Sequence, residues 1–255
     1  DHRDLHSFPT RRSSDLAILD KNYASVTFLT VAVQQFREVR KAERDSLEKL
    51  EHSEYIQRGA AYIDGISKTF ESRSYISLIT ALFTVLAMKL INLSQPPLNI
   101  AVGVFAGLLV IFFCHRFTKG KTMESICTVR VGKIEVRGSE LYVDDMFVTN
   151  YLGTDRSRET FLKEGIAVVL KPKDEACRIT LENYGQRQAV FYEAVRALGV
   201  KRYQFMRRNF ATGNVILAFV PILNDPNQLI RAIRNTPILE NSRKVKRIMD
   251  TNLGG

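Results

Sequence analysis

Two long apolar runs dominate the hydropathy pattern of the chain. The first, Tyr75–Leu93, is YISLITALFTVLAMKLINL, and the second, Leu98–Phe117, is LNIAVGVFAGLLVIFFCHRF. Neither run contains Asp or Glu, and at about 1.5 Å per helical residue each can cross the hydrocarbon core of a bilayer. The link Ser94–Pro97 ends in two prolines, so the chain must turn there. The pattern predicts a transmembrane helical hairpin over residues 75–117, in preference to a buried hairpin in a soluble core.

The orientation of this hairpin follows from its basic flanks. Lys68 and Arg73 precede the first run, Arg116, Lys119 and Lys121 follow the second, and the link between the runs carries no basic residue. Basic residues gather on the cytoplasmic side of membrane proteins. We therefore expect a multi-pass protein of the cell membrane with its C-terminal part in the cytoplasm. The basic residues after the second run are candidates for contact with lipid headgroups.

Residues 17–74 predict a helical region next to the membrane. Its first apolar stretch, Ala24–Val33, is too short to span a bilayer alone. An interfacial helix, a re-entrant helix and the inner part of a larger bundle all fit this stretch. Charged residues at i,i+4 spacing then predict a solvated helix. After Arg58-Gly59, an apolar stripe at helical spacing is expected to lead into the first span along the membrane surface: Tyr62, Ile63, Ile66 and Phe70.

Residues 118–255 predict a small cytoplasmic α+β domain, with strand-helix-strand-helix order after a hairpin and a ferredoxin-like fold as one option. Asp225-Pro226 marks the start of the last helix, and Gly199 marks the end of an earlier one. The predicted strands are Val129–Val136 and Leu141–Val148 around a Gly138-Ser139 turn, then Ile166–Leu170 and Gly213–Pro221, and the earlier helix is Leu181–Leu198.

Residues 1–16 show neither a helical nor a strand period. Their sequence is DHRDLHSFPTRRSSDL, and the part LHSFPTRRSSDL resembles the translation of a short-read sequencing adapter. We interpret this segment as a non-native scar rather than a natural disordered tail. The interpretation predicts that native N-terminal sequence is missing.

Composition narrows the chemistry that the chain can support. Apolar residues make up 45% and charged residues 25%, which excludes wholesale disorder. The three Cys form no CxxC pair, so neither a disulfide framework nor an ordinary cysteine zinc site is expected. With the scar set aside, the histidines are His52 and His115, and neither accompanies a nucleophile motif. We predict no enzyme activity, no catalytic residue, no metal site and no cofactor.

One acidic doublet, Asp144-Asp145, lies at an apparent strand junction. A turn or bulge is its favoured interpretation. An unrecognised enzyme site would need a pocket that joins these carboxylates or Arg207 to other polar groups. In the second apolar run, Gly103-x-x-x-Gly107 predicts close helix packing, within the hairpin or between chains, so an oligomer stays open.

The chain is basic, with a formal net charge of +10. From His115 onward it has 24 basic and 15 acidic residues. Attraction to anionic lipid beside a membrane anchor is a simpler explanation than nucleic-acid binding, because no RNA-binding aromatic motif accompanies the charge. We therefore expect the lipid bilayer as a partner and no nucleic acid.

The hexapeptide Tyr62-Ile63-Asp64-Gly65-Ile66-Ser67 resembles the namesake sequence of the YIEGIA family of bacterial membrane proteins. Further blocks look like the same family: NYASVTFLTVAVQQFREVR (22–40), LENYGQRQAVFYEAVRALGV (181–200), RRNFATGNVILAFVP (207–221) and TPILE (236–240). The resemblance implies a spore-forming source, further N-terminal transmembrane segments and a small companion protein of the capping-complex type. It implies no catalytic residue.

Two classes of function follow from these expectations. The favoured hypothesis is a non-enzymatic, membrane-anchored scaffold or assembly component, with a link to sporulation, whose cytoplasmic domain docks a small protein. The alternative is a component of a membrane transporter or channel. That alternative requires ionisable groups in other spans, because the two apolar runs offer almost none.

Overall fold

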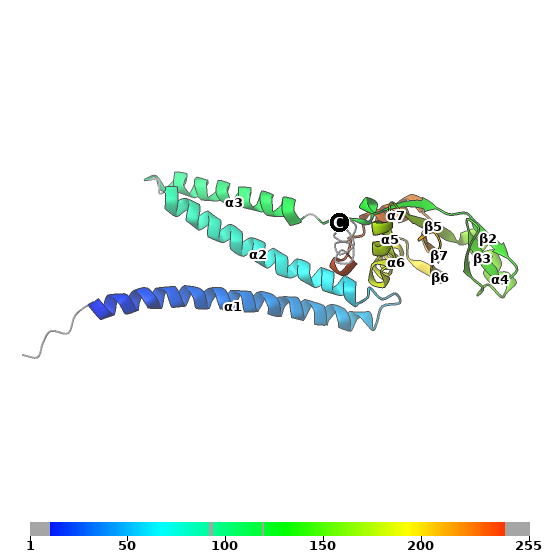
Figure 1. The fold of residues 1–255 in the computed structure, drawn as a ribbon, viewed down its shortest axis with the longest axis horizontal. Helices are drawn as coiled ribbons and strands as arrows, with labels where there is room; N and C mark the ends of the chain where they lie inside the picture. Colours follow the sequence, from blue (N-terminus) through cyan, green and yellow to red (C-terminus); the bar gives the residue numbers. More distant parts are fainter. Residues whose placement is uncertain (1–10, 92–93, 119, 243–255) are drawn as a thin grey trace, which may run out of the picture.

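The computed structural model describes residues 11–91, 94–118 and 120–242, with side chains from residue 27 onward. Long helices extend from one side of a compact, strand-rich domain (Figure 1). These helices are α1 (Arg11–Glu51), α2 (Ala60–Ile91) and α3 (Pro96–Thr118). α2 runs antiparallel to both of the others and packs against each of them.

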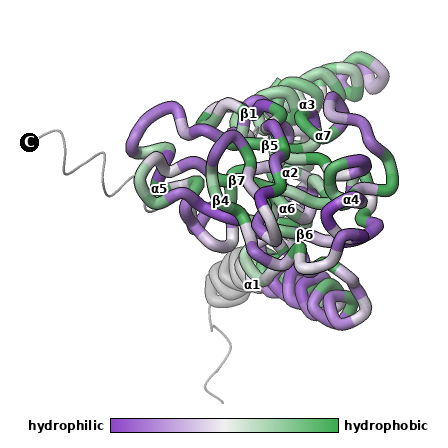
Figure 2. The backbone as a smooth tube through the Cα atoms, turned by 90° about the vertical axis from the view of Figure 1, so that its right-hand side faces the viewer, coloured by the Kyte–Doolittle hydropathy of each residue, from purple (hydrophilic) through white to green (hydrophobic). Residues whose placement is uncertain are grey.

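α2 and α3 are long and apolar enough to cross a membrane. Their large apolar side chains point outward: Leu82 is 63% exposed, Phe105 is 65% exposed and Phe112 is 65% exposed. Figure 2 shows α3 coloured hydrophobic along most of its length. A core helix of a soluble protein would bury such side chains against other elements.

The helix boundaries differ from the predicted ones in two places. α2 runs without a break through the expected boundary between residues 74 and 75, so the membrane-proximal segment and the first apolar run form one helix. α3 begins at Pro96 rather than Leu98. Proline is tolerated in the first turn of a helix because its missing N–H would have no partner there.

The domain after α3 has three layers. Its middle layer is a four-stranded antiparallel sheet in the order β1-β5-β7-β6. These strands are β1 (Cys127–Val131), β5 (Ile166–Pro172), β6 (Val200–Arg208) and β7 (Val215–Pro221), and a single 3₁₀ turn, Met123–Ser125, precedes β1. One face carries α5 (Glu175–Glu182), α6 (Tyr184–Leu198) and α7 (Pro226–Asn235). The other face carries α4 (Asp155–Glu164) and a second sheet of β2 (Ile134–Arg137), β3 (Glu140–Val143) and β4 (Met146–Thr149).

Alternation along the central strands builds a core on each face of the sheet. In β5, Val168 and Leu170 pack toward the helices, whereas Ala167 and Val169 pack toward the second sheet. All seven residues of β7 are buried, as its continuous apolar sequence predicted. The domain therefore has helices on one side, a second sheet on the other, and its most apolar strand in the middle.

Two predicted strands are wrong because each is really a pair of strands. Val129–Val136 divides at Gly132, where a Cβ would overlap with the side chain of Val143. The chain crosses there from the first sheet to the second. Leu141–Val148 divides at Asp144-Asp145, which adopt φ values of 50° and 62° in a two-residue hairpin turn.

The helix predicted over Leu181–Leu198 is also two helices. Asn183 ends α5 and caps α6 by accepting a hydrogen bond from the Gln186 N–H at 3.1 Å. Gly199 ends α6 with φ 68°, as predicted. Asp225 caps α7 through the N–H groups of residues 227 and 228, with Pro226 at its first position. The predicted order omitted α4 and β6 altogether, so strand-helix-strand-helix is too simple.

Candidate functional site

The hexapeptide lies where the first turns of α2 contact α6 and residues 236–242, and we call this contact the junction. The chain enters it through Gly59, which has φ 87°. The N–H groups of Arg58 and Gly59 donate to the carboxylate of Glu51 at 2.6 and 3.3 Å. The Arg58 guanidinium lies 5.0 Å from the ring centroid of Tyr192 on α6. These contacts fix the end of α1 and the start of α2 to the domain.

Tyr62 is the central side chain of the junction. It is 8% exposed and packs with Ala189 of α6 and with Leu239. Its hydroxyl donates a hydrogen bond to Glu193, which also accepts one from Arg196 at 2.7 Å. Burial, followed by the hydrogen bond to Glu193, raises the pKa of Tyr62. The phenol therefore stays protonated at neutral pH and acts as a donor beside an open hollow of about 310 Å³.

Close backbone approach accompanies this side-chain packing. A Cβ at Gly185 would lie 2.9 Å from the Cβ of Ala61, and one at Gly65 would lie 3.7 Å from Leu239. Within the hexapeptide, Ile63 is 1% exposed and Ser67 is fully buried. The Ser67 hydroxyl donates to the carbonyl of residue 64 at 3.0 Å. Tyr62 and Ile66 of the apolar stripe thus pack against α6 and Leu239.

A chain of ion pairs surrounds Asp64 on the other side of the junction. Asp64 accepts hydrogen bonds from Arg40 of α1 at 2.8 Å and from Lys68 at 2.9 Å. Arg40 also contacts Glu71 at 3.1 Å, and Lys68 contacts Glu240 at 2.5 Å. Burial alone would raise the pKa of Asp64, but the hydrogen bonds from Arg40 and Lys68 outweigh it and hold that pKa below its usual range. This network ties α1, α2 and the C-terminal segment together.

Gln186, in the first turn of α6, closes the junction from the domain side. Its side chain is fully buried and donates to the carbonyl of Pro237 at 3.0 Å. Its carbonyl oxygen accepts hydrogen bonds from the N–H of Leu239 at 2.8 Å and from the hydroxyl of Ser242 at 3.0 Å. Sequence analysis did not identify Gln186, Glu193 or Arg40. The apolar stripe signalled a buried face in this region but gave no indication of what covers it.

The two glycines of the second run lie in the contact between α2 and α3. Gly103 and Gly107 are both buried. A Cβ at Gly103 would lie 2.5 Å from the Met88 sulfur, and a Cβ at Gly107 would lie 2.8 Å from the Thr84 hydroxyl. The glycines therefore let the two apolar helices of one chain approach closely.

The remaining candidate residues lie apart from the junction. Arg116 is exposed in the last turn of α3. The carbonyl of Lys121 accepts a hydrogen bond from the N–H of Ile238 at 3.0 Å, next to a bridge between Thr122 and Pro237. Lys119 lies outside the described residues.

The acidic doublet is neutralised by arginines at the hairpin turn. Asp144 pairs with Arg130 and accepts a hydrogen bond from the Lys133 N–H at 2.8 Å. Asp145 pairs with Arg137 at 2.6 Å. Among the described residues, no three His, Cys, Asp or Glu side chains lie close enough together to hold a metal ion.

Comparison with known proteins identifies the family whose namesake sequence resembles the hexapeptide at the junction. The family model described as "YIEGIA protein" matches residues 16–248. The chain belongs to the YIEGIA family. A chain of Bacillus subtilis (strain 168) that carries the name "Uncharacterized protein YphB" is 33% identical over 233 residues, which cover 89% of this chain and 76% of the relative. No solved structure was found to match.

Proposed function

We propose that this YIEGIA-family chain is a multi-pass membrane protein in which α2 and α3 cross the bilayer. The proposal is supported by the length, composition and outward-facing apolar side chains of these helices. Lys68, Arg73 and Arg116 lie toward the end of the helices that joins the domain. Lys89 lies in the last turn of α2, and the turn at residues 94–97 carries no basic residue. By the positive-inside tendency, the α+β domain then lies in the cytoplasm.

α1 belongs to the same membrane region in this proposal. Its Phe36 ring stacks edge-on against Tyr75 of α2, with centroids 5.2 Å apart. Because α1 is one continuous antiparallel helix, position 24 lies about 18 Å further along the first span. The short apolar stretch Ala24–Val33 is therefore at the level of the first span along the helix axes, although α1 diverges from α2 toward this end (Figure 1).

We infer that the central sheet of the domain has ferredoxin-like connectivity with its last strand moved to the front. The run β5, α5-α6, β6, β7, α7 follows the strand-helix-strand-strand-helix part of that fold. β1 takes the place of the final strand, antiparallel to β5 at the edge. The bridge between Thr122 and Pro237 brings the end of α7 to the start of β1. This arrangement places the segment before β1 and the segment after α7 on the same side of the domain.

The function that the geometry supports best is a non-enzymatic scaffold that holds its domain in a fixed orientation at the membrane. The junction carries this proposal. α2 is a single helix whose first turns pack on α6 and whose later turns form the first span. A tethered domain would instead follow a flexible linker. Rigid attachment suits a protein that presents a surface to a partner at a defined distance from the bilayer.

We propose that a small protein docks at the end of the domain distant from the helices. There, α4 and the second sheet form the tip of the molecule (Figure 1). Tyr151 is 78% exposed and Leu162 of α4 is 57% exposed, and interface centres are enriched in aromatic and apolar side chains. A companion of the capping-complex type, which the family resemblance implies, and a role in sporulation are part of this proposal.

Cross-linking in cells followed by purification in detergent tests the scaffold proposal. We expect one small protein to be recovered in a fixed ratio to the chain, and a Tyr151→Ser, Leu162→Ser double variant to lose it. A matched control, Tyr184→Ser, changes a residue that is 68% exposed at the start of α6 and should retain the protein. Equal recovery from the two variants, or no protein in a fixed ratio, contradicts the proposal.

A further inference from the structure

Three arginines, one from each long helix, lie at the same level along the helix axes. The stack of Phe36 on Tyr75 places Arg37 of α1 at the level of Arg73 of α2. On the other side of α2, the contacts of Gly103 with Met88 and of Gly107 with Thr84 set the register with α3. Counting along the antiparallel helices from these contacts brings residue 116 to the same level.

All three arginines are exposed, and within the described residues none forms an ion pair with a carboxylate. The acidic side chains nearest to this level are already engaged. Glu71 accepts a hydrogen bond from Arg40 at 3.1 Å, and Glu38 accepts hydrogen bonds from the amides of Gln34 and Gln35 at 3.3 and 3.2 Å. The guanidinium groups are therefore free to bind an anion from outside the chain.

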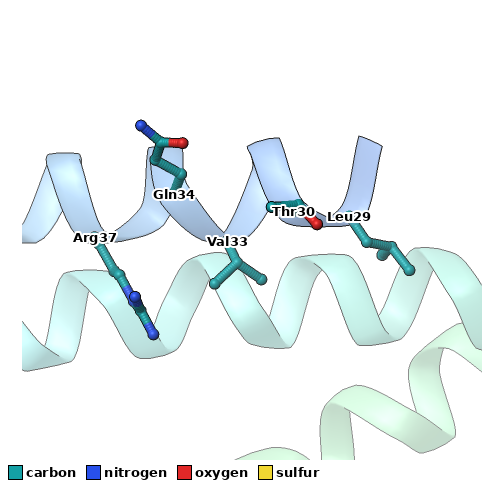
Figure 3. Close-up of a pocket in the computed structure, with 5 residues that line it drawn as sticks. All are labelled: Leu29, Thr30, Val33, Gln34 and Arg37. Atoms are coloured by element: carbon teal, nitrogen blue, oxygen red, sulfur yellow. The ribbon is translucent and has the colours of Figure 1, made fainter. Parts of the chain in front are cut away.

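Arg37 also lies at one end of a hollow on α1. This open groove of about 430 Å³ is lined by five residues, all of them on α1: Leu29, Thr30, Val33, Gln34 and Arg37. In Figure 3, the side chains of Leu29, Val33 and Arg37 point toward α2, whereas Gln34 points away from it. Leu29 and Val33 thus form an apolar part of the groove, on the side of the apolar runs. Arg37 forms its cationic end, at the level of Arg73 and Arg116.

We propose that this groove binds one anionic phospholipid, with an acyl chain against Leu29 and Val33 and the headgroup phosphate at Arg37. The inference rests on the proposed membrane location of the helices. Charge complementarity favours the anion, because guanidinium groups bind phosphate through paired N–H donors. The apolar part favours a lipid over a free phosphate, because an acyl chain can cover Leu29 and Val33 whereas inorganic phosphate cannot. Arg73 and Arg116 extend the cationic level around the bundle.

The expected change in lipid affinity follows from the binding free energy that one basic residue contributes at an anionic membrane surface. One arginine near such a surface changes lipid affinity by about fivefold. We therefore expect Arg37→Gln to weaken binding of phosphatidylglycerol about fivefold, with little effect on phosphatidylcholine. Val33→Phe should also weaken binding with Arg37 intact, because the larger side chain fills the apolar part of the groove.

Native mass spectrometry of the full chain, released from detergent micelles, tests the proposal. Dioleoyl phosphatidylglycerol and dioleoyl phosphatidylcholine are titrated separately, and Arg156→Gln on the exposed face of α4 serves as the matched control. The expected result is preferential retention of phosphatidylglycerol that is weaker in both groove variants and unchanged in Arg156→Gln. Inorganic phosphate should not displace the lipid.

Three results would overturn the proposal: equal retention of the two lipids, equal retention by Arg37→Gln and Arg156→Gln, or displacement of the lipid by inorganic phosphate. Sedimentation of the wild-type chain with membranes, measured in parallel, separates this failure from a failure of the membrane proposal. A chain that sediments with membranes but shows no lipid preference contradicts only the proposal that the groove binds an anionic phospholipid.

Discussion

Replacing Tyr62 tests whether the junction holds the domain to the long helices. Truncating a buried aromatic side chain to Ala costs about 3–5 kcal/mol in a closed core. Tyr62 borders an open hollow, so we expect about 3 kcal/mol for Tyr62→Ala, at the lower end of that range. Tyr62→Phe removes only the hydroxyl that donates to Glu193, and Arg196 still pairs with that carboxylate. Its expected cost is therefore about 1 kcal/mol.

Hydrogen exchange of the full chain in detergent micelles measures both variants. A loss of about 3 kcal/mol corresponds to roughly 100-fold faster exchange wherever opening of the junction limits exchange. We expect amides in residues 184–198 of α6 to exchange fastest in Tyr62→Ala, more slowly in Tyr62→Phe and most slowly in the wild type. Tyr151→Ala, which changes a 78% exposed tyrosine, is the matched control. Wild-type exchange of α6 in Tyr62→Ala would refute the reasoning.

Three further predictions test neighbouring parts of the structure. Gly107→Ile places a side chain against Thr84 and should lower the melting temperature in detergent, whereas Val104→Ile on the exposed side should not; equal melting of the two contradicts the close packing. Gln186→Leu leaves buried partners unsatisfied and should cost about 3 kcal/mol of unfolding free energy in denaturant titrations; an unchanged midpoint contradicts this role. Asp64→Asn should cost about 1 kcal/mol near pH 7. Because the pKa of Asp64 is lowered in the folded state, this stabilisation is complete above the unfolded pKa and is lost as pH falls through the folded pKa. The stabilities of Asp64→Asn and the wild type should therefore converge in acid, and a constant difference would contradict the pKa argument.

Strong local signals were sufficient to predict several elements. The apolar runs predicted α2 and α3, the continuous run Gly213–Pro221 predicted a strand buried on both faces, and Asp225-Pro226 predicted the start of α7. Each of these signals depends on composition or capping within a single segment. Tertiary contacts contribute little to them, so one sequence was enough.

Elements that depend on distant partners were missed or divided wrongly. Gly132 separates β1 from β2 because Val143 and Val169 crowd it, and both contacts are distant in sequence. β6 is an edge strand with four basic residues and a bulge, and α4 buries little besides Phe161, so neither carries a clear period. The junction was out of reach for the same reason: its partners come from α1, α6 and the C-terminal segment.

Labelling of single cysteines in intact cells tests the central claim most directly. Ser94→Cys lies in the turn between the apolar helices, and Tyr151→Cys lies in the domain. Both changes are made in a chain whose native cysteines, Cys114, Cys127 and Cys177, are replaced by Ala. We predict that a membrane-impermeant maleimide labels Ser94→Cys in intact cells and labels Tyr151→Cys only after permeabilisation. Labelling of Tyr151→Cys in intact cells, or recovery of the chain in the soluble fraction without detergent, would contradict the account.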